Sequence, residues 1–171
     1  MHLDELIRTR RTHKAYAPEP VERAVLEELF ELARWAPNHH LTNPWRFRVL
    51  GPEALRALKA AAGPENAAKL DRAPTLVAVS AIGSDADPVV DQEDLAAGAV
   101  AAFIVLLGAH ARGLGGYWRT PGVLRTAEGR AACAIEPGER VLGLLHLGQI
   151  RGPDRPAPDR APLDAIRSYL P

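Results

Sequence analysis

The sequence predicts one mixed domain in three layers, α/β or α+β, with helices packed on a sheet. The length of 171 residues favours a single domain, or at most two small ones. Apolar residues recur at helical spacing over residues 21–36, whereas the β-branched apolar run over residues 74–82 is typical of a strand buried on both faces. The predicted helices outnumber the four or so strands, which does not fit a regular doubly wound sheet.

The first half of the chain carries three predicted helices and, besides the strand over residues 74–82, one further strand. A short amphipathic helix begins near Leu3 and ends in a basic turn over residues 8–14. The helix over residues 21–36 is stopped by Pro37. Alternating apolar and polar side chains predict a half-buried strand over residues 45–50, and alanine and leucine content predicts a helix over residues 53–62.

The second half adds two further strands and a tail. Residues 113–118 turn into a short strand and residues 141–148 form another buried strand. Four prolines and alternating charge within residues 151–162 predict an extended arm that runs over a surface.

A long helix is predicted from about residue 90 to residue 113. Its middle, residues 96–109, is apolar on every side, so it must be covered all round. A single small domain has little material for that, and a dimer interface would supply the cover. The uncharged stretch of residues 95–109 is shorter than the roughly 20 residues that a membrane-spanning helix needs.

Charge and composition exclude several classes of protein. Lys and Arg number 21 against 21 Asp and Glu, a balance that argues against a nucleic-acid binder. The single cysteine, Cys133, excludes an intramolecular disulfide and a cysteine-rich metal site. Residues 1–15 offer no apolar core of a signal peptide, so we expect a cytoplasmic protein without a membrane partner.

The basic turn over residues 8–14 is the first stretch suited to binding. Arginine pairs next to a hydroxyl can grip phosphate, because guanidinium donors match phosphate oxygens two at a time. Alternatively, the same residues form a basic turn that is exposed to solvent and binds no phosphate.

A second stretch, residues 36–45, holds two amides, two imidazoles and a hydroxyl between prolines. Such a loop is suited to hydrogen bonds with a polar heterocycle. No carboxylate or thiol stands nearby, so the sequence predicts no metal site.

The third stretch, residues 113–121, combines glycines, which allow close backbone approach, with aromatic, cationic and hydroxyl side chains. A long helix precedes it, so it is not a Rossmann motif. No catalytic acid, base or nucleophile stands out: Cys133 has an apolar setting, and the serines lack an elbow motif. This pattern favours a bound cofactor that performs the chemistry.

These stretches resemble, in order, the motifs of the FMN-dependent nitroreductase family, in particular its short, homodimeric branch. RRTHKAY at residues 10–16 is similar to the family's R-R-S-x-R/K-x-F opening. WAPNHHLTNPWRF at residues 35–47 resembles A-P-S/D-x-x-x-x-Q-P-W-x-F, and GLGGYW at residues 113–118 resembles G-L-G-x-x-W. LHLG at residues 145–148 and PDRAPL at residues 158–163 are similar to the family's tail.

The resemblance implies an α+β fold of three layers (α/β/α), in which helices cover both faces of a mixed, mainly antiparallel sheet. It implies a homodimer with FMN at the interface, a long central dimerisation helix, and a single flavin-binding domain over residues 1–171. Residues 151–171 would be the arm that reaches the partner subunit. The residues expected to bind the cofactor are Arg10, Arg11, Thr12, Lys14, His39, Asn43, Trp118, Arg119, Thr120 and Arg160.

Individual roles follow the family's motifs. Arg10 would hold the phosphate with Arg11, Thr12 and Arg160, and Lys14 would lie near the pyrimidine edge of the ring. His39 would reach the flavin from the other subunit, and Trp118, Arg119 and Thr120 would line it. The sequence departs from the family in three places: Thr12 replaces Ser, Asn43 replaces Gln, and Pro158 replaces a tail Lys.

The expected activity is hydride transfer from NADH or NADPH through FMN to nitroaromatic, quinone or related conjugated acceptors, by a ping-pong mechanism. Two alternatives stay open. One is a flavin-binding store or sensor without turnover. The other is an interaction module in which residues 8–14 contact nucleic acid or a protein without any cofactor.

Overall fold

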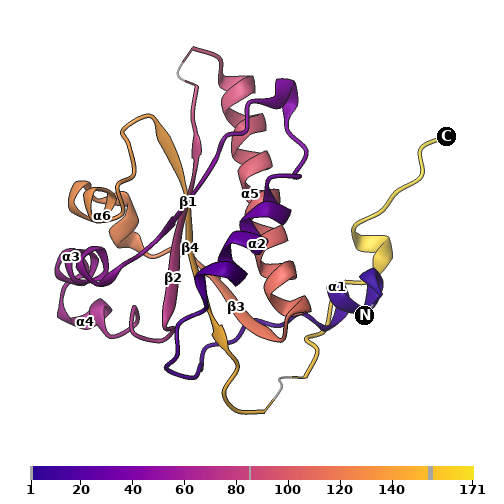
Figure 1. Cartoon of the computed structure of the whole chain (residues 1–171). Helices are drawn as coiled ribbons and strands as arrows, with labels where there is room; N and C mark the ends of the chain where they lie inside the picture. Colours follow the sequence, from indigo (N-terminus) through magenta and orange to yellow (C-terminus); the bar gives the residue numbers. More distant parts are fainter. Residues whose placement is uncertain (1, 85, 154–155) are drawn as a thin grey trace.

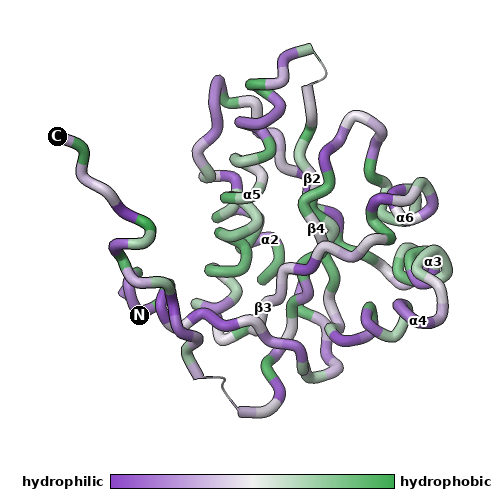
Figure 2. Tube along the Cα trace, turned by 180° about the vertical axis from the view of Figure 1, so that it is seen from behind, coloured by the Kyte–Doolittle hydropathy of each residue, from purple (hydrophilic) through white to green (hydrophobic). Residues whose placement is uncertain are grey.

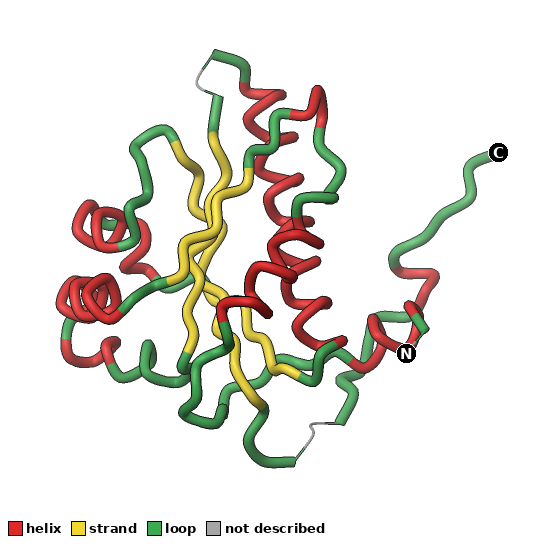
Figure 3. Tube along the Cα trace, in the orientation of Figure 1, coloured by secondary structure: helices red, strands yellow, loops and turns green. Residues whose placement is uncertain are grey.

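A computed structural model describes residues 2–84, 86–153 and 156–171. A four-stranded antiparallel sheet in the order β1-β2-β4-β3 separates two layers of helices (Figures 1 and 3). The strands are β1 (Trp45–Val49), β2 (Thr75–Ile82), β3 (Leu114–Arg119) and β4 (Glu139–Gln149). The predicted three-layer α+β class is confirmed, and the pairings among the four strands are all antiparallel.

Helices cover both faces of the sheet (Figure 1). The first face packs against α2 (Arg23–Ala33) and α5 (Pro88–Ala111). The opposite face lies under α3 (Pro52–Ala62), α4 (Pro64–Ala67) and α6 (Ala127–Ala132). Each face of the sheet packs into its own hydrophobic core, and alternate residues of β4 point into the two cores. Leu145 belongs to the core on the α5 side and Leu144 to the core on the α3 side.

The predicted elements are present with shifted ends. The helix expected over residues 21–36 ends at Ala33, because a residue that precedes a proline, here Ala36 before Pro37, avoids helical geometry. The long helix begins two residues early, at Pro88, where the Asp87 carboxylate accepts hydrogen bonds from Val89 N (2.9 Å) and Val90 N (3.3 Å). The short helices α4 and α6 were not predicted, since helices of four and six residues carry no clear apolar period.

The helix α5 is covered on one side only. Among the described residues, its inner face is buried against the sheet and α2, whereas Val100 and Phe103 are 40% and 38% exposed. The outward residues Ala96, Val100, Phe103 and Leu107 follow helical spacing, so they form one apolar stripe, called here the α5 stripe. Figure 2 shows α5 as apolar along most of its length. By length and composition α5 could span a membrane, but half of its most apolar window is buried within the fold, as in a core helix.

The N-terminal helix lies beside the C-terminal end of α5, and the C-terminal tail passes that helix. The helix α1 (Leu3–Thr9) contacts α5 there, and Thr9 Oγ1 lies 2.9 Å from His110 Nε2. The segment that follows pairs with the sheet edge through a parallel bridge, Thr12 to Gly116, and an antiparallel one, Tyr16 to Ile150. Residues 156–171 pass α1 and run away from the body as an exposed tail with one short 3₁₀ turn, Leu163–Ala165 (Figure 1).

Candidate cofactor-binding site

Residues from both ends of the chain line a single cavity, called here the arginine cavity. Its volume is about 600 Å³. It is lined by Arg10, Arg11, Thr12, Pro156, Ala157, Pro158 and Arg160. The four phosphate-binding residues expected from the sequence therefore meet in one place, and Pro158 forms part of an apolar wall where the family motif has a lysine.

The arginine cavity carries positive charge that no carboxylate among the described residues neutralises. Burial and the neighbouring charges of Arg160 and Arg11 lower the pKa of Arg10 from its usual value. Arg11 is held in place by two hydrogen bonds from Nη1, to Arg8 O (2.7 Å) and to Arg10 O (3.0 Å). Its buried Nε has no partner within the described part of the chain. Clustered guanidinium donors of this kind suit a phosphate group.

Lys14 lies beside β3, two residues after Thr12 of the arginine cavity. Thr12 bridges Gly116, so residues 12–14 run parallel to the start of β3. The Lys14 Nζ lies 5.7 Å from the centre of the Tyr117 ring, a cation–π contact. The segment over residues 10–14 carries Arg10, Thr12 and Lys14 at every second position. In extended conformation it spans roughly 13 Å, since each residue advances about 3.3 Å.

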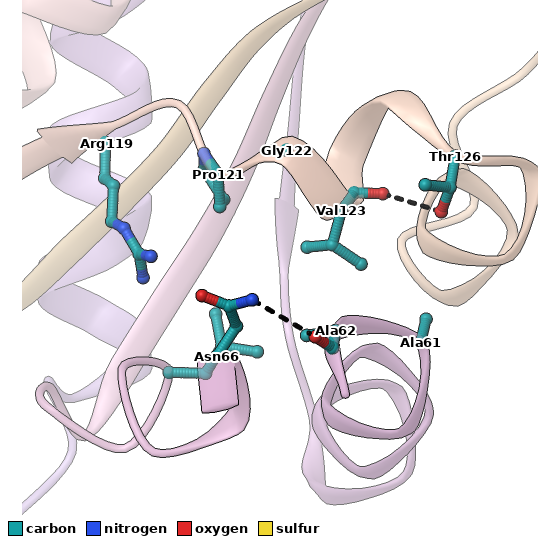
Figure 4. Close-up of a pocket in the computed structure, with 9 residues that line it drawn as sticks. Ala61, Ala62, Asn66, Arg119, Pro121, Gly122, Val123 and Thr126 are labelled. Carbon is teal, nitrogen blue, oxygen red and sulfur yellow. Dashed lines mark hydrogen bonds between the residues drawn. The ribbon is translucent and has the colours of Figure 1, made fainter. Parts of the chain in front are cut away.

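Arg119, at the end of β3, lines a second and smaller pocket, called here the edge pocket. It has a volume of about 290 Å³ (Figure 4). Its nine lining residues are Ala61, Ala62, Asn66, Leu70, Arg119, Pro121, Gly122, Val123 and Thr126. Figure 4 shows the guanidinium of Arg119 reaching toward the amide of Asn66 across the pocket. The Nη1 atom of Arg119 is buried and has no partner among the described residues.

The two residues that flank Arg119 are placed differently. Trp118 packs against the core on the α5 side, and its Nε1 donates a hydrogen bond to Leu142 O at 2.9 Å. Thr120 is exposed just beyond the strand. The structure thus brings Arg119 to a pocket and Trp118 to the sheet core, whereas Thr120 does not line that pocket.

His39 and Asn43 lie in a loop at the other end of α5. His39 Nδ1 contacts Glu93 Oε2 at 2.6 Å, and the Thr42 hydroxyl donates to Asp94 Oδ1 at 2.6 Å, so the loop is fixed to the first turns of α5. Asn43 has a positive φ of 48°, and its Nδ2 donates to Leu41 O at 2.7 Å. We call residues 38–43 the polar loop.

Within one chain, the polar loop and the arginine cavity are far apart. The polar loop is fixed near the start of α5, whereas α1 and the arginine cavity lie near its end (Figure 1). A helix of 24 residues is about 36 Å long. One chain therefore does not bring His39 and Asn43 to the other predicted cofactor residues.

Comparison with known proteins relates the chain to one family. A family model described as "Nitroreductase family" matches residues 7–69, which include Arg10, Lys14 and the polar loop. The Bacillus subtilis (strain 168) protein named "Putative NAD(P)H nitroreductase YfhC" is 27% identical over 176 residues, covering 94% of this chain and 86% of that protein. These matches support a protein of the nitroreductase family.

Solved structures of proteins described as nitroreductases or nitroreductase-like share the whole fold. The nitroreductase-like family protein from Bacillus cereus superposes with a TM-score of 0.88 at 24% identity, covering 99% of this chain and 96% of that one. The FMN and NADPH-dependent nitroreductase NfnB from Sphigopyxis sp. strain HMH gives a TM-score of 0.79 at 17% identity, covering 99% of each chain. At these identities the likeness concerns the fold alone.

Sequence reasoning missed most of the edge pocket. Asn66 and Leu70 come from the α4 region, and Ala61 and Ala62 from the end of α3. An alanine-rich helix end followed by a single turn gives no functional signal. The two orphaned ring nitrogens of His146 on β4 were also missed, because a lone histidine in an apolar strand is indistinguishable from a core residue.

Proposed function

We propose that this chain is an FMN-dependent oxidoreductase that takes hydride from NADH or NADPH. The observation that carries the proposal is the arginine cavity, where Arg10, Arg11 and Arg160 face one another without a neutralising carboxylate among the described residues. A phosphate dianion fits this donor set, because each guanidinium offers paired N–H groups and the Thr12 hydroxyl adds a neutral donor.

Named residues would hold the two parts of FMN. Arg10, Arg11, Thr12 and Arg160 would bind the phosphate. Lys14, together with Arg119 and Thr120 at the end of β3, would face the ring, while Trp118 would support β3 from behind through its bond to Leu142. The Arg119 guanidinium suits this role, since it offers several N–H donors and flavin edges carry carbonyl oxygens that accept hydrogen bonds.

The chemistry supplied by bound FMN would be hydride acceptance from NAD(P)H and electron transfer to a conjugated acceptor such as a nitroaromatic or a quinone. The protein's part is binding, orientation and electrostatics. Lys14 and Arg119 would stabilise negative charge at the ring edge, which favours reduction. Because donor and acceptor would use the same ring face in turn, the proposed mechanism is ping-pong. The names of YfhC and NfnB support NAD(P)H as donor.

We also propose a homodimer in which the α5 stripe is the contact. Two α5 helices packed antiparallel would bury Val100 and Phe103 of each copy. The same arrangement would bring the polar loop of one copy toward the arginine cavity of the other, since these features lie at opposite ends of α5. The exposed apolar side chains of the tail, Leu163, Ile166, Tyr169 and Leu170, would then find cover on the partner. We further propose that the protein is cytoplasmic.

The deciding experiment is an absorption spectrum of the purified protein, with the released flavin identified by mass, followed by NADH and NADPH oxidation under air. A yellow protein that contains FMN and oxidises NAD(P)H supports the proposal. A colourless protein that cannot be reconstituted with FMN contradicts it. A protein that binds FMN but does not oxidise NAD(P)H would instead be a flavin store or sensor.

A further inference from the structure

His146, at the centre of β4, is a buried imidazole that no role described so far uses. Its side chain has 0% exposure, and neither Nδ1 nor Nε2 has a hydrogen-bond partner within the described residues. Buried polar atoms are nearly always satisfied by protein, ligand or ordered water. Two buried nitrogens on one ring, without a hydrogen-bond partner among the described residues, therefore indicate a further polar neighbour, such as an ordered water.

The strand register brings His146 and Arg119 onto one face of the sheet. His146 pairs with Tyr117, and Arg119 pairs with Leu144, so Tyr117, Arg119, Leu144 and His146 share a face. This is the face of the α3-side core, to which Leu144 and the pocket residue Leu70 both belong. His146 and Arg119 are diagonal neighbours across two strands, a relationship that places Cβ atoms roughly 7–8 Å apart.

Arg119 also carries an orphaned buried atom, its Nη1, and it lines the edge pocket. A diagonal spacing of this size is too long for two short side chains to touch, but the long arginine side chain and one water can close it. Burial and the charges of Arg119 and Arg72 lower the pKa of His146 to about 4. The ring is therefore neutral at neutral pH, and one of its nitrogens is an acceptor.

We propose that His146 is a positioning residue that holds the Arg119 guanidinium through one bridging water, and thereby orients Arg119 toward the ring of bound FMN. This role rests on the proposed flavin site. Arg119 Nη1–H would donate to the water, the water would donate to the acceptor nitrogen of His146, and the remaining Arg119 donors would be free to face the edge pocket. The Tyr117 ring, 5.5 Å from the imidazole at 38°, limits the space in which His146 can turn.

A double-mutant cycle tests this inference. The four proteins are the wild type, His146→Phe, Arg119→Met and the double variant, each titrated with FMN. We expect His146→Phe to weaken FMN binding by about threefold to tenfold, the range for one typical hydrogen bond. In the Arg119→Met background the same change should alter the dissociation constant less than about twofold. An equal effect in both backgrounds, or no effect in either, would overturn the positioning role.

Two further variants separate positioning from packing. His146→Gln keeps a donor and an acceptor, so it should restore most of the binding lost in His146→Phe. Leu147→Met changes a buried neighbour on the opposite face of β4 and should leave FMN binding unchanged. If His146→Phe does not fold, His146→Leu against Arg119→Met completes the cycle, with coupling expected and additivity contradicting it.

Failure of the flavin proposal would be recognised separately. If the wild type binds no FMN, the same cycle is measured by urea unfolding of the FMN-free proteins, where coupled effects support the Arg119–His146 link and additive effects refute it. A crystal structure should show a water within hydrogen-bond distance of both Arg119 Nη1 and a His146 ring nitrogen. Direct contact of the imidazole with apolar atoms only would exclude the bridge.

Discussion

Arg10 and Arg160, from opposite ends of the sequence, line the same cavity, and the charge of Arg160 contributes with burial to lower the pKa of Arg10. Two guanidinium groups held this close repel each other unless an anion lies between them. The fold thus keeps an unfavourable charge arrangement that a phosphate group would convert into a favourable one.

Replacing Arg10 should affect FMN more than riboflavin. We expect Arg10→Met to weaken FMN binding about tenfold to hundredfold, because it removes charge-assisted hydrogen bonds to the phosphate. Riboflavin lacks the phosphate, so its affinity should change little. Titration of both flavins against Arg10→Met measures the difference, with Arg125→Met, an exposed arginine outside the cavity, as the control. Equal losses for both flavins would argue against a phosphate role.

Lys14 should tune the bound ring rather than hold it. In Lys14→Met, FMN should stay bound while its reduction potential becomes more negative and NAD(P)H oxidation slows, because a cation near the ring edge is lost. Redox titration beside steady-state kinetics gives both quantities. Arg56→Met, on the exposed side of α3, is the control, because it also removes one positive charge. An unchanged potential with full turnover would remove Lys14 from the site.

The α5 stripe should control assembly. A charge at its centre, Phe103→Glu, should shift the protein to the monomer and lower FMN occupancy, because burying an unpaired carboxylate in the contact is costly. Sedimentation velocity and the flavin-to-protein ratio report the two effects. Glu128→Gln, far from the stripe on α6, is the control. A dimer that persists with Phe103→Glu would place the interface elsewhere.

The tail should serve both assembly and cofactor binding. Truncation after Arg151 removes Arg160 and the exposed apolar residues beyond it, so dimer stability and FMN affinity should both fall. The double substitution Ile166→Ser and Leu170→Ser keeps Arg160, and should weaken the dimer more than phosphate binding. A truncated chain that remains a dimer with full FMN occupancy would refute the role of the arm.

Stability should decline in mild acid because of His146. Its pKa is about 4 in the folded protein, against about 6.5 in an unfolded chain. Between these values the unfolded chain binds a proton that the folded protein does not, so the free energy of unfolding falls as pH drops from about 6.5 to 4. The full effect is on the order of 3 kcal/mol. Urea unfolding at several pH values should show a shallower decline for His146→Phe than for the wild type; parallel declines would contradict this assignment.

The sequence predicted the regular elements well because their patterns are local. The run over residues 74–82 and the apolar stretch inside α5 each specify one element through burial alone. The ends were less certain: the Asp87 cap and the turn before Pro37 shift two helices by two or three residues. The helix α4 is a single turn after Pro64, formed by tertiary context rather than by periodicity.

The site was predictable only in part, since its geometry is not local. The motif around Arg10 and the tail residue Arg160 could be joined through family resemblance, and the structure brings them together. Asn66 and His146 gave no signal, because one lies in an alanine-rich turn and the other in an apolar strand. Their positions depend on strand register and on how α4 packs, neither of which short patterns specify.

The arginine cavity has a consequence for biosynthesis. Its walls come from residues 10–12 and from residues 156–160, so a nascent chain cannot complete it until nearly all of this sequence has left the ribosome. The sheet and α5 can form earlier, since domains begin to fold as they emerge. Cofactor capture in this cavity would therefore follow folding of the core, and a chain truncated before residue 156 would fold most of its core yet lack one wall of the cavity.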